Sequence, residues 1–242
     1  MILTHQIRTK FPFFQKNSDI VFLDTAASSQ KPESVIQGMA DFYSYHYANI
    51  HRGAYPLADN ATKAYEQARE KVKNLISAKS KREVVITKGA TEGINLIARS
   101  LADAGMLTKG DTILLSEMEH HANTVPWLQL KDRIGIHIEY IPFDKDKNLD
   151  MNAYKKLLQK ESVKLVSITH VSNVLGTVND VKEVCKIAKE KGVLSLIDGC
   201  QAVPHFPVDV QDIHCDFYVF SSHKMYGPTG VGALYGRLEL LK

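Results

Sequence analysis

The stretch Asp216-Phe-Tyr-Val-Phe-Ser-Ser-His-Lys-Met-Tyr-Gly-Pro-Thr-Gly-Val-Gly232 decides how the chain folds. Its apolar run from Phe217 to Phe220 has the length and the aromatic and β-branched content typical of a buried strand. Hydroxyl residues, glycines and a proline follow at once, which indicates that the strand ends in a loop. Lys224 lies in this loop. Desolvation at such a place favours the neutral amine, which is a nucleophile.

A neutral lysine amine at the end of a buried strand is what a Schiff base with pyridoxal phosphate (PLP) requires. The alternative is an ordinary solvated loop lysine, and for a lysine taken alone this alternative is the more frequent one. Whether Lys224 is functional therefore depends on which residues the rest of the chain brings near it.

Composition narrows the protein class. The chain has 242 residues, of which 44% are hydrophobic, enough for one large α/β domain or two small ones. A net charge of +3 without a basic run indicates no nucleic-acid partner. No apolar run is long enough to cross a bilayer, and Met1 opens no secretory signal pattern. The three cysteines lack Cys-x-x-Cys spacing, so we expect a cytoplasmic protein without a structural metal.

Runs of strand length recur from Glu83 onwards. They cover residues 84–87, 112–116, 137–141, 164–169, 194–197, 217–220 and 231–235. Helical patterns separate most of them, over residues 91–101, 151–159 and 181–191, and earlier helices are expected over 32–45 and 60–78. Strands alternating with helices predict a mainly parallel sheet covered on both faces. Ligands bind such sheets at the carboxyl ends of the strands.

A candidate phosphate site follows the first predicted strand, in Thr87-Lys-Gly-Ala-Thr-Glu-Gly-Ile-Asn95. A tight turn there enters a helix, so free N–H groups at Ala90 and Thr91 and the positive end of the helix dipole would face a ligand. The alternative is that Thr91 merely caps the helix. The sequence alone favours neither.

Two further strand ends carry candidate ligand-binding side chains. His120 and His121 follow the second predicted strand. They could be metal ligands, a surface pair, or a source of one imidazole stacked on a flat ring. Chain neighbours point apart and no third ligand is at hand, which argues against a metal. Asn173 follows the fourth strand, where it could donate to a ligand oxygen or simply hold a turn.

Asp198 closes the fifth predicted strand. A buried carboxylate needs a partner, and a protonated pyridine nitrogen would be one. Asp198 would then keep that proton on the ring and maintain the ring as an electron sink. The alternative is a helix N-cap, since small residues follow. Asp198 and Lys224 end strands that are successive in the sequence, so we expect both to reach one ring.

These motifs, taken in order, resemble those of the class V aminotransferase family, and most closely its group II cysteine desulfurases of the SufS type. The matching segments are residues 24–28, 51–53, 89–93, 119–123, 169–176, 198–202 and 221–230. The resemblance implies the large domain of PLP-dependent transferase fold type I, an α/β fold. Its sheet would have seven mostly parallel strands, helices on both faces, and residues 231–235 as the antiparallel member.

The resemblance also implies roles for individual residues. Lys224 would hold the cofactor covalently, His121 would stack on the ring as a second catalytic residue, and Asp198 would pair with the ring nitrogen. Gln201 would contact the phenolic oxygen. The residues expected around the phosphate are Ala90, Thr91, Ser221 and His223. Those expected near the substrate are Ala27, His51, Arg52 and Asn173, the last of which would also lie beside the cofactor.

By the same resemblance, the protein would be a transferase that takes sulfur from L-cysteine for iron–sulfur cluster assembly, or selenium from L-selenocysteine. L-Alanine and an enzyme persulfide would be the products. A homodimer and a sulfur acceptor of the SufE or SufU type would be its partners, with neither nucleic acid nor membrane involved.

We expect residues 1–50 to be a helical segment that packs with a small domain in the family, and residues 51–242 to be the PLP-binding large domain. The C-terminal small domain of the family, which carries the acceptor cysteine, would be absent. Cys185, Cys200 and Cys215 are not expected to replace that cysteine, and Cys200 stands where the family usually has alanine. Two alternatives stay open: a truncated, non-catalytic PLP-binding module, and a related enzyme of the selenocysteine lyase or kynureninase type.

Overall fold

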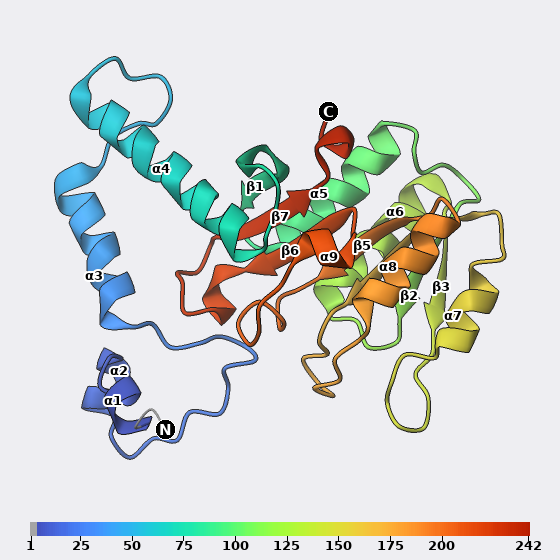
Figure 1. Cartoon of the computed structure of the whole chain (residues 1–242), viewed down its shortest axis with the longest axis horizontal. Helices are drawn as coiled ribbons and strands as arrows, with labels where there is room; N and C mark the ends of the chain where they lie inside the picture. The colour runs from blue at the N-terminus through green and yellow to red at the C-terminus, as the bar shows by residue number, and fades with distance from the viewer. Residues whose placement is uncertain (1–3) are drawn as a thin grey trace.

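A seven-stranded sheet forms the centre of the molecule (Figure 1). The structure is a computed structural model and describes residues 4–242. The strand order is β1-β7-β6-β5-β4-β2-β3. The parallel strands are β2 (Thr112–Ser116), β3 (His137–Ile141), β4 (Val163–Thr169), β5 (Leu194–Asp198) and β6 (Phe217–Ser221). The strand β7 (Gly232–Gly236) runs antiparallel to β6 and to β1 (Val84–Thr87). The predicted sheet and its antiparallel member are confirmed.

The α-helices are α1 (Thr4–Arg8), α2 (Pro12–Lys16), α3 (Glu33–Asp41), α4 (Pro56–Leu75), α5 (Ala90–Asp103), α6 (Val125–Ile134), α7 (Met151–Leu157), α8 (Val181–Glu190) and α9 (Val210–Ile213). The prediction placed α5, α7 and α8 correctly but missed α6 and α9. The predicted helix over 32–45 is α3 followed by a π-helical turn, Phe42–His46. The predicted helix over 60–78 begins earlier, because Pro56 is its first residue, a position that suits proline.

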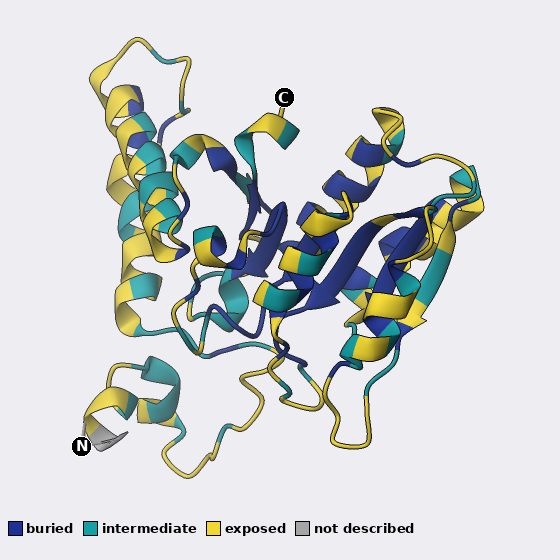
Figure 2. Ribbon diagram, turned by 45° about the vertical axis from the view of Figure 1, so that its right-hand side comes forward, coloured by how far each residue is buried: buried dark blue, intermediate teal, exposed yellow. Residues whose placement is uncertain are grey.

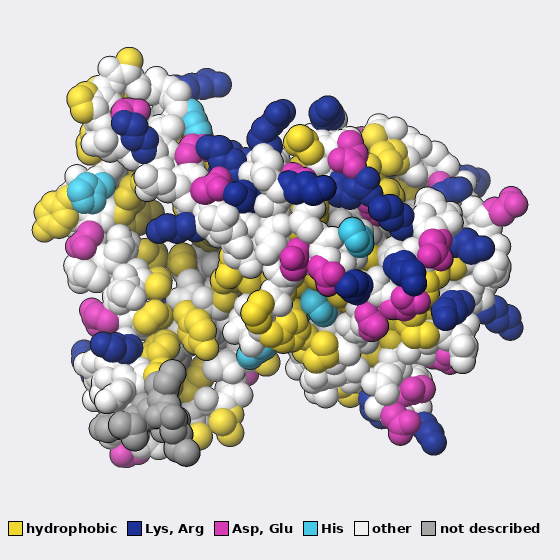
Figure 3. Space-filling model, viewed as in Figure 1, with side chains coloured by type: hydrophobic (Ala, Val, Ile, Leu, Met, Phe, Trp, Pro, Cys, Tyr) yellow, Lys and Arg dark blue, Asp and Glu magenta, His cyan; other side chains and the backbone are white. Residues whose placement is uncertain are grey.

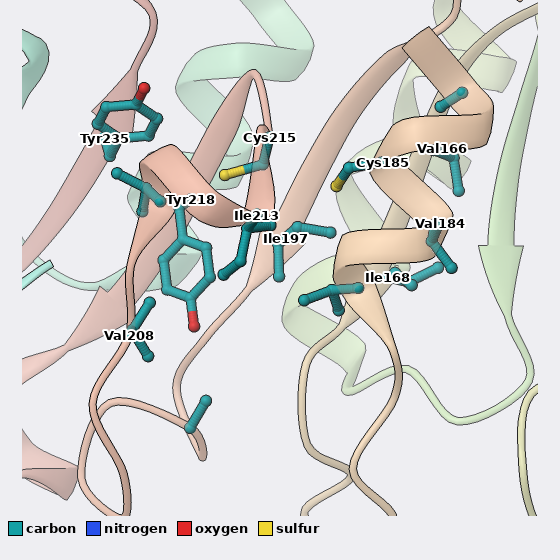
Figure 4. Packing of buried hydrophobic residues seen from close by; sticks show 14 of the residues in the cluster. Val166, Ile168, Val184, Cys185, Ile197, Val208, Ile213, Cys215, Tyr218 and Tyr235 are labelled. Atoms are coloured by element: carbon teal, nitrogen blue, oxygen red, sulfur yellow. The ribbon is translucent and has the colours of Figure 1, made fainter. Parts of the chain in front are cut away.

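Helices cover both faces of the sheet, and β4 shows how. Leu165 packs with residues of α5 and α6, whereas the next residue, Val166, packs with α7, α8 and α9 on the other face. Figure 2 shows the buried strands between these helix layers. In Figure 4, Val184 and Cys185 of α8 lie over the side chains of β4, β5 and β6. Two apolar cores therefore hold the strand ends in fixed positions relative to one another.

The helices α3 and α4 form an arm beside the sheet, below which α1 and α2 lie in the view of Figure 1. Ala58 and Ala61 of α4 pack with Ala48 in a small separate cluster. Hydrophobic side chains gather between this arm and the rest of the molecule in the view of Figure 3. The domain boundary at residue 50 stays a prediction. Within residues 4–242, no helix is both long enough and apolar enough to span a membrane.

Candidate functional site

A cavity of about 410 Å³ lies at the carboxyl ends of β5 and β6, within the usual size range of small-molecule sites. Its wall is built from segments far apart in the sequence. The lining residues are Asp24, Ala26, Ala27, Ala90, Thr91, His120, Ala122, Asn173, Asp198, Cys200, Ser221, His223 and Lys224. The sheet explains this convergence, because parallel strands that lie side by side present their carboxyl ends at one edge.

Most of the predicted site residues meet in this cavity. They are Ala27, Ala90, Thr91, Asn173, Asp198, Ser221, His223 and Lys224. Four predicted residues do not line it, namely His51, Arg52, His121 and Gln201. Their functional roles, like those of the residues that do line the cavity, stay predictions at this point.

Asp198 is the last residue of β5 and is only 4% exposed. Its Oδ1 atom accepts a hydrogen bond of 3.0 Å from the backbone N–H of Cys200, which forms a turn after the strand. No helix starts there, so the helix N-cap alternative for Asp198 is wrong. The result is a buried carboxylate in the cavity wall. It lies on β5, the immediate neighbour of the strand that leads to Lys224.

The cavity is bounded on another side by the first turn of α5. The helix starts at Ala90, so its N-cap residue is Gly89, which makes no side-chain cap. Thr91 lies inside the helix, and the alternative in which Thr91 is the cap is therefore wrong. The Ala90 N–H donates to the Ser221 hydroxyl at 2.9 Å. A side chain at Gly232 would place its Cβ 2.5 Å from the Gly89 Cα, so glycine there lets β7 approach this turn closely. The N-terminus of a fourteen-residue helix thus meets a hydroxyl at the cavity.

Lys224 ends the short 3₁₀ turn Ser222–Lys224 that follows β6. The positive charge of Lys224 affects the pKa values of two histidines, His120 and His223. Burial and then the charge of Lys224 lower the pKa of His120, while the Asp198 carboxylate raises it. Burial, Lys224 and Lys31 lower the pKa of His223 in the same way. Both histidines are therefore biased toward the neutral form.

Of the two adjacent histidines, the structure places His120, and not the predicted His121, in the cavity wall. Both side chains are exposed, but only His120 lines the cavity. The Nδ1 atom of His120 accepts a hydrogen bond of 3.1 Å from the Ala122 N–H, which orients its ring. Adjacent side chains point in different directions, so only one of the two can face the cavity. The sequence carries no signal that separates them.

Three other predicted residues also lie outside this cavity. Gln201 donates from Nε2 to the Ala26 carbonyl at 2.7 Å and lines an adjoining cavity of about 590 Å³. His51 donates its N–H to the Thr62 hydroxyl at 2.9 Å, and its ring meets Tyr65 edge-on. His51 and the exposed Arg52 lie in the loop before α4. This loop belongs to the arm and not to the cavity wall.

Sequence reasoning did not place Asp24, Ala26 or Ala122 in the site wall. The available signal for Ala26 is the run of small residues at 26–29, which lets the backbone lie close to other parts of the chain or to a ligand. Cys200, which stands where the family usually has alanine, also lines the cavity. Its Sγ lies 3.7 Å from the Ser221 hydroxyl.

Behind His120, the carboxyl group of Glu119 is buried in a network of donors. Its Oε1 accepts from the Ser116 hydroxyl at 2.5 Å and from the Thr169 N–H at 2.8 Å, and its Oε2 accepts from Asn123 at 2.6 Å. Burial raises the pKa of Glu119 to about 7, and these three hydrogen bonds oppose the rise. The network ties the end of β2 to the end of β4 beneath the histidine.

None of the three cysteines is an activated thiol. All are buried. Burial raises the pKa of Cys185 to about 12 and raises the pKa values of Cys200 and Cys215 well above the usual range. The thiolate is the reactive form, so these environments disfavour nucleophilic attack. In the part of the chain that the structure describes, no group of three histidine, cysteine or acidic side chains could hold a metal ion.

The donor set of the cavity fits PLP. Lys224 offers an amine for the aldehyde, and the buried Asp198 offers a carboxylate for the pyridine nitrogen. Thr91 and the Ser221 hydroxyl, which accepts from the Ala90 N–H and keeps its own proton to donate, offer hydrogen-bonding groups for a phosphate at a helix N-terminus. His120 offers a flat ring.

Comparison with known proteins agrees with this geometry. The family described as aminotransferase class-V matches residues 21–242. A probable cysteine desulfurase of Halalkalibacterium halodurans is 45% identical over 236 residues, which are 96% of this chain and 58% of that protein. The structure of a cysteine desulfurase from Thermococcus onnurineus NA1 has a TM-score of 0.91 and 36% identity, covering 99% of this chain and 58% of the other.

A third related structure, of the protein SspA in complex with cysteine, has a TM-score of 0.82 and 30% identity, covering 90% of this chain and 61% of the other. The chain thus spans about three fifths of the length of these relatives. The enzymes of the matched family depend on PLP. This chain belongs to the class-V aminotransferase family.

Proposed function

We propose that this chain is the PLP-binding part of a cysteine desulfurase. The observation that carries the proposal is the cavity that brings Lys224, Asp198 and the N-terminus of α5 together at one edge of the sheet. The family match and the cysteine desulfurases among the relatives support it. Each of these relatives is longer than this chain, so the activity proposed is that of a complete protein of which residues 1–242 form the cofactor site.

The predicted residues that line the cavity, together with His120, have proposed tasks. Lys224 would bind the cofactor aldehyde through Nζ, and its free amine would take the proton from the substrate Cα. Asp198 holds a proton at the pyridine nitrogen, and His120 orients the ring from one face. Ala90, Thr91, Ser221 and His223 bind the phosphate. Asn173 and Ala27, which line the same cavity, are proposed to contact the substrate. Bound PLP supplies an electron sink for the negative charge that develops at the substrate Cα.

Gln201, His51 and Arg52 keep weaker proposed roles. Gln201 already donates to the Ala26 carbonyl, but a second N–H remains on its amide for the phenolic oxygen of the cofactor. His51 and Arg52 lie in the loop before α4 and do not line the cavity. The arrangement described above therefore gives them no contact with a substrate in this cavity.

L-Cysteine is the substrate that we propose, and the motifs favour the group II, SufS type. The relative solved in complex with cysteine supports a cavity of this kind for that amino acid. In the proposed reaction a thiolate attacks the substrate sulfur, the Cβ–S bond breaks, and the sulfur leaves as a persulfide. Protonation of the remaining carbon skeleton gives L-alanine. The persulfide sulfur would pass to an acceptor of the SufE or SufU type for iron–sulfur cluster assembly in the cytoplasm, with the enzyme acting as a homodimer.

The attacking thiolate has to come from outside the described residues. Cys185, Cys200 and Cys215 are all buried with raised pKa values. The same observation favours a second candidate function, in which residues 1–242 bind PLP without catalysing sulfur transfer. A selenocysteine lyase or a kynureninase-type enzyme would use the same cofactor residues and differ in the substrate.

Exchange of the substrate α-proton separates these functions. We expect residues 1–242 loaded with PLP to exchange the Cα proton of L-cysteine slowly in D₂O, as followed by NMR, and to release no substantial sulfide or alanine. Exchange with L-cysteine but not with L-kynurenine supports the desulfurase. PLP binding without any exchange supports the non-catalytic module. Robust sulfide release that Lys224→Ala abolishes would contradict the account, since an acceptor cysteine would then lie within this chain.

A further inference from the structure

The turn that carries Lys224 is held by a residue almost two hundred positions earlier in the chain. Ser29 is 4% exposed, and its hydroxyl donates to the His223 carbonyl at 3.0 Å. The same hydroxyl accepts the Tyr226 N–H at 2.8 Å. The Ser29 backbone N–H donates to the His223 carbonyl as well, at 2.9 Å. One side chain therefore binds the backbone on both sides of Lys224.

The hydrogen bonds within the Lys224 turn do not involve the two backbone groups that Ser29 binds. The turn's own backbone hydrogen bonds run from the N–H groups of Met225 and Gly227 to the Ser222 carbonyl, both at 2.9 Å. The His223 carbonyl and the Tyr226 N–H are the groups that Ser29 joins. Tyr226 also has a φ of 68°, in the left-handed region that costs a non-glycine residue about 1 kcal/mol or more. A strained turn of this kind keeps its shape only when contacts from outside hold it.

Other residues of the same segment, 24–31, strengthen the attachment. The Nζ atom of Lys31 lies 3.1 Å from the His223 carbonyl. At the other end of the segment, the Ala26 carbonyl accepts from Gln201 at 2.7 Å, on the Asp198 side of the cavity. The segment is thus fixed to both loops that carry the main proposed cofactor residues, and Asp24, Ala26 and Ala27 form a wall of the cavity between them.

We propose that Ser29 is a positioning residue for Lys224, and that its hydroxyl fixes the direction in which the lysine leaves the turn. The inference rests on the proposed role of Lys224 in binding PLP. A lysine side chain is long and flexible, so its amine is delivered to one point only when the backbone that carries it is fixed. Small misplacements of reacting groups slow bond formation strongly.

The first test uses the chain without cofactor and compares Ser29→Ala with Ser28→Ala. Ser28 is a matched control, because its hydroxyl reaches the same carbonyl at only 3.4 Å and makes no bond to Tyr226. Losing a hydrogen bond worth about 1.4 kcal/mol should raise hydrogen exchange at the Tyr226 amide about tenfold. The amides of β6 should keep their protection in both variants. Unchanged exchange at Tyr226, or lost protection across β6 as well, would overturn the proposal.

The second test measures how fast PLP acquires the visible absorbance of its lysine-bound form, in a stopped-flow experiment. We expect Ser29→Ala to slow this step about tenfold and Ser28→Ala to leave it unchanged. Equal rates for Ser29→Ala and the parent would show that Ser29 only supports the fold, which also overturns the proposal. If the parent chain takes up no PLP, the proposed function fails, whereas the exchange at Tyr226 still decides whether Ser29 holds the turn.

Discussion

The backbone N–H of Ala90 donates a 2.9 Å hydrogen bond to the hydroxyl of Ser221. This bond joins the first residue of α5 to the last residue of β6, whose positions in the sequence are 131 residues apart. It places a hydroxyl at a helix N-terminus, where the helix dipole and free N–H groups favour an anion. The phosphate of PLP is the anion that we expect there.

Ser221→Ala should therefore weaken binding of the phosphorylated cofactor specifically. A hydrogen bond to a charged group contributes about 1.5–3 kcal/mol, so we expect the Kd for PLP to rise at least about tenfold. Pyridoxal, which lacks the phosphate, is the matched control ligand and should bind the variant and the parent equally. Absorbance titrations with both ligands measure this. Equal losses for PLP and pyridoxal would mean that Ser221 supports the cavity and not the phosphate.

The histidine pair gives a second prediction. His120→Ala should weaken PLP binding because the variant loses the flat ring in the cavity wall, and about 1 kcal/mol of stacking corresponds to roughly a fivefold loss of affinity. His121→Ala is the matched control and should bind PLP as the parent does. Fluorescence titration of the two variants measures both affinities. The reverse order would restore the role first predicted for His121.

Asp198→Asn tests the electronic role of the buried carboxylate. The amide oxygen can still accept the Cys200 N–H, so we expect the fold and PLP binding to persist. The variant cannot hold the pyridine proton by charge, which should slow exchange of the L-cysteine α-proton by about tenfold or more. NMR in D₂O measures the exchange, and the visible spectrum confirms that the cofactor is bound. A variant that exchanges as fast as the parent would argue against this role.

Glu119 predicts how stability depends on pH. Burial raises its pKa from the usual value of 4.5 to about 7 in the folded chain. As the pH rises between these values, the unfolded chain loses this proton first, so the free energy of unfolding falls and then levels off above pH 7. A shift of this size corresponds to about 3 kcal/mol at most. Ionisation in the folded state leaves the three hydrogen-bond donors of the network satisfied.

Glu119→Gln removes this titration. We expect the difference in unfolding free energy between pH 5 and pH 8 to shrink by up to about 3 kcal/mol relative to the parent, as measured by urea unfolding. Glu117→Gln changes an exposed neighbour on the same turn and should keep the parent's dependence. A Glu119→Gln protein with the parent's pH dependence would mean that the Glu119 carboxyl ionises at its usual pH.

Most of the strands were predictable because their residues are buried on both faces, whereas the edge strand β3 is only partly buried. The run from Val163 to Thr169 reads as continuous apolar sequence interrupted by few polar residues, and such runs have clear ends. Every predicted strand agrees with the structure to within one residue at each end. The helix α6 was missed because only three of its ten residues are buried, which leaves a weak helical pattern in the sequence.

The site was predictable as far as it depends on strand ends. Asp198 and Lys224 follow neighbouring parallel strands, so topology alone brings them together. The choice between His120 and His121 depends on the rotation of one short turn, which no periodicity records. The bonds from Ser29 to the Lys224 turn join residues 194 and 197 positions apart, and only the folded chain shows them.

Reductive trapping tests the central claim most directly. The chain is mixed with PLP, reduced with borohydride, digested and mapped by mass spectrometry. We predict that the pyridoxyl group is found on Lys224 and that Lys224→Ala abolishes the label. Lys88→Ala, which removes an exposed lysine beside the proposed phosphate site, should leave the label in place. A label on any other lysine, or equal labelling of the Lys224→Ala chain, would contradict the proposal that this cavity holds PLP through Lys224.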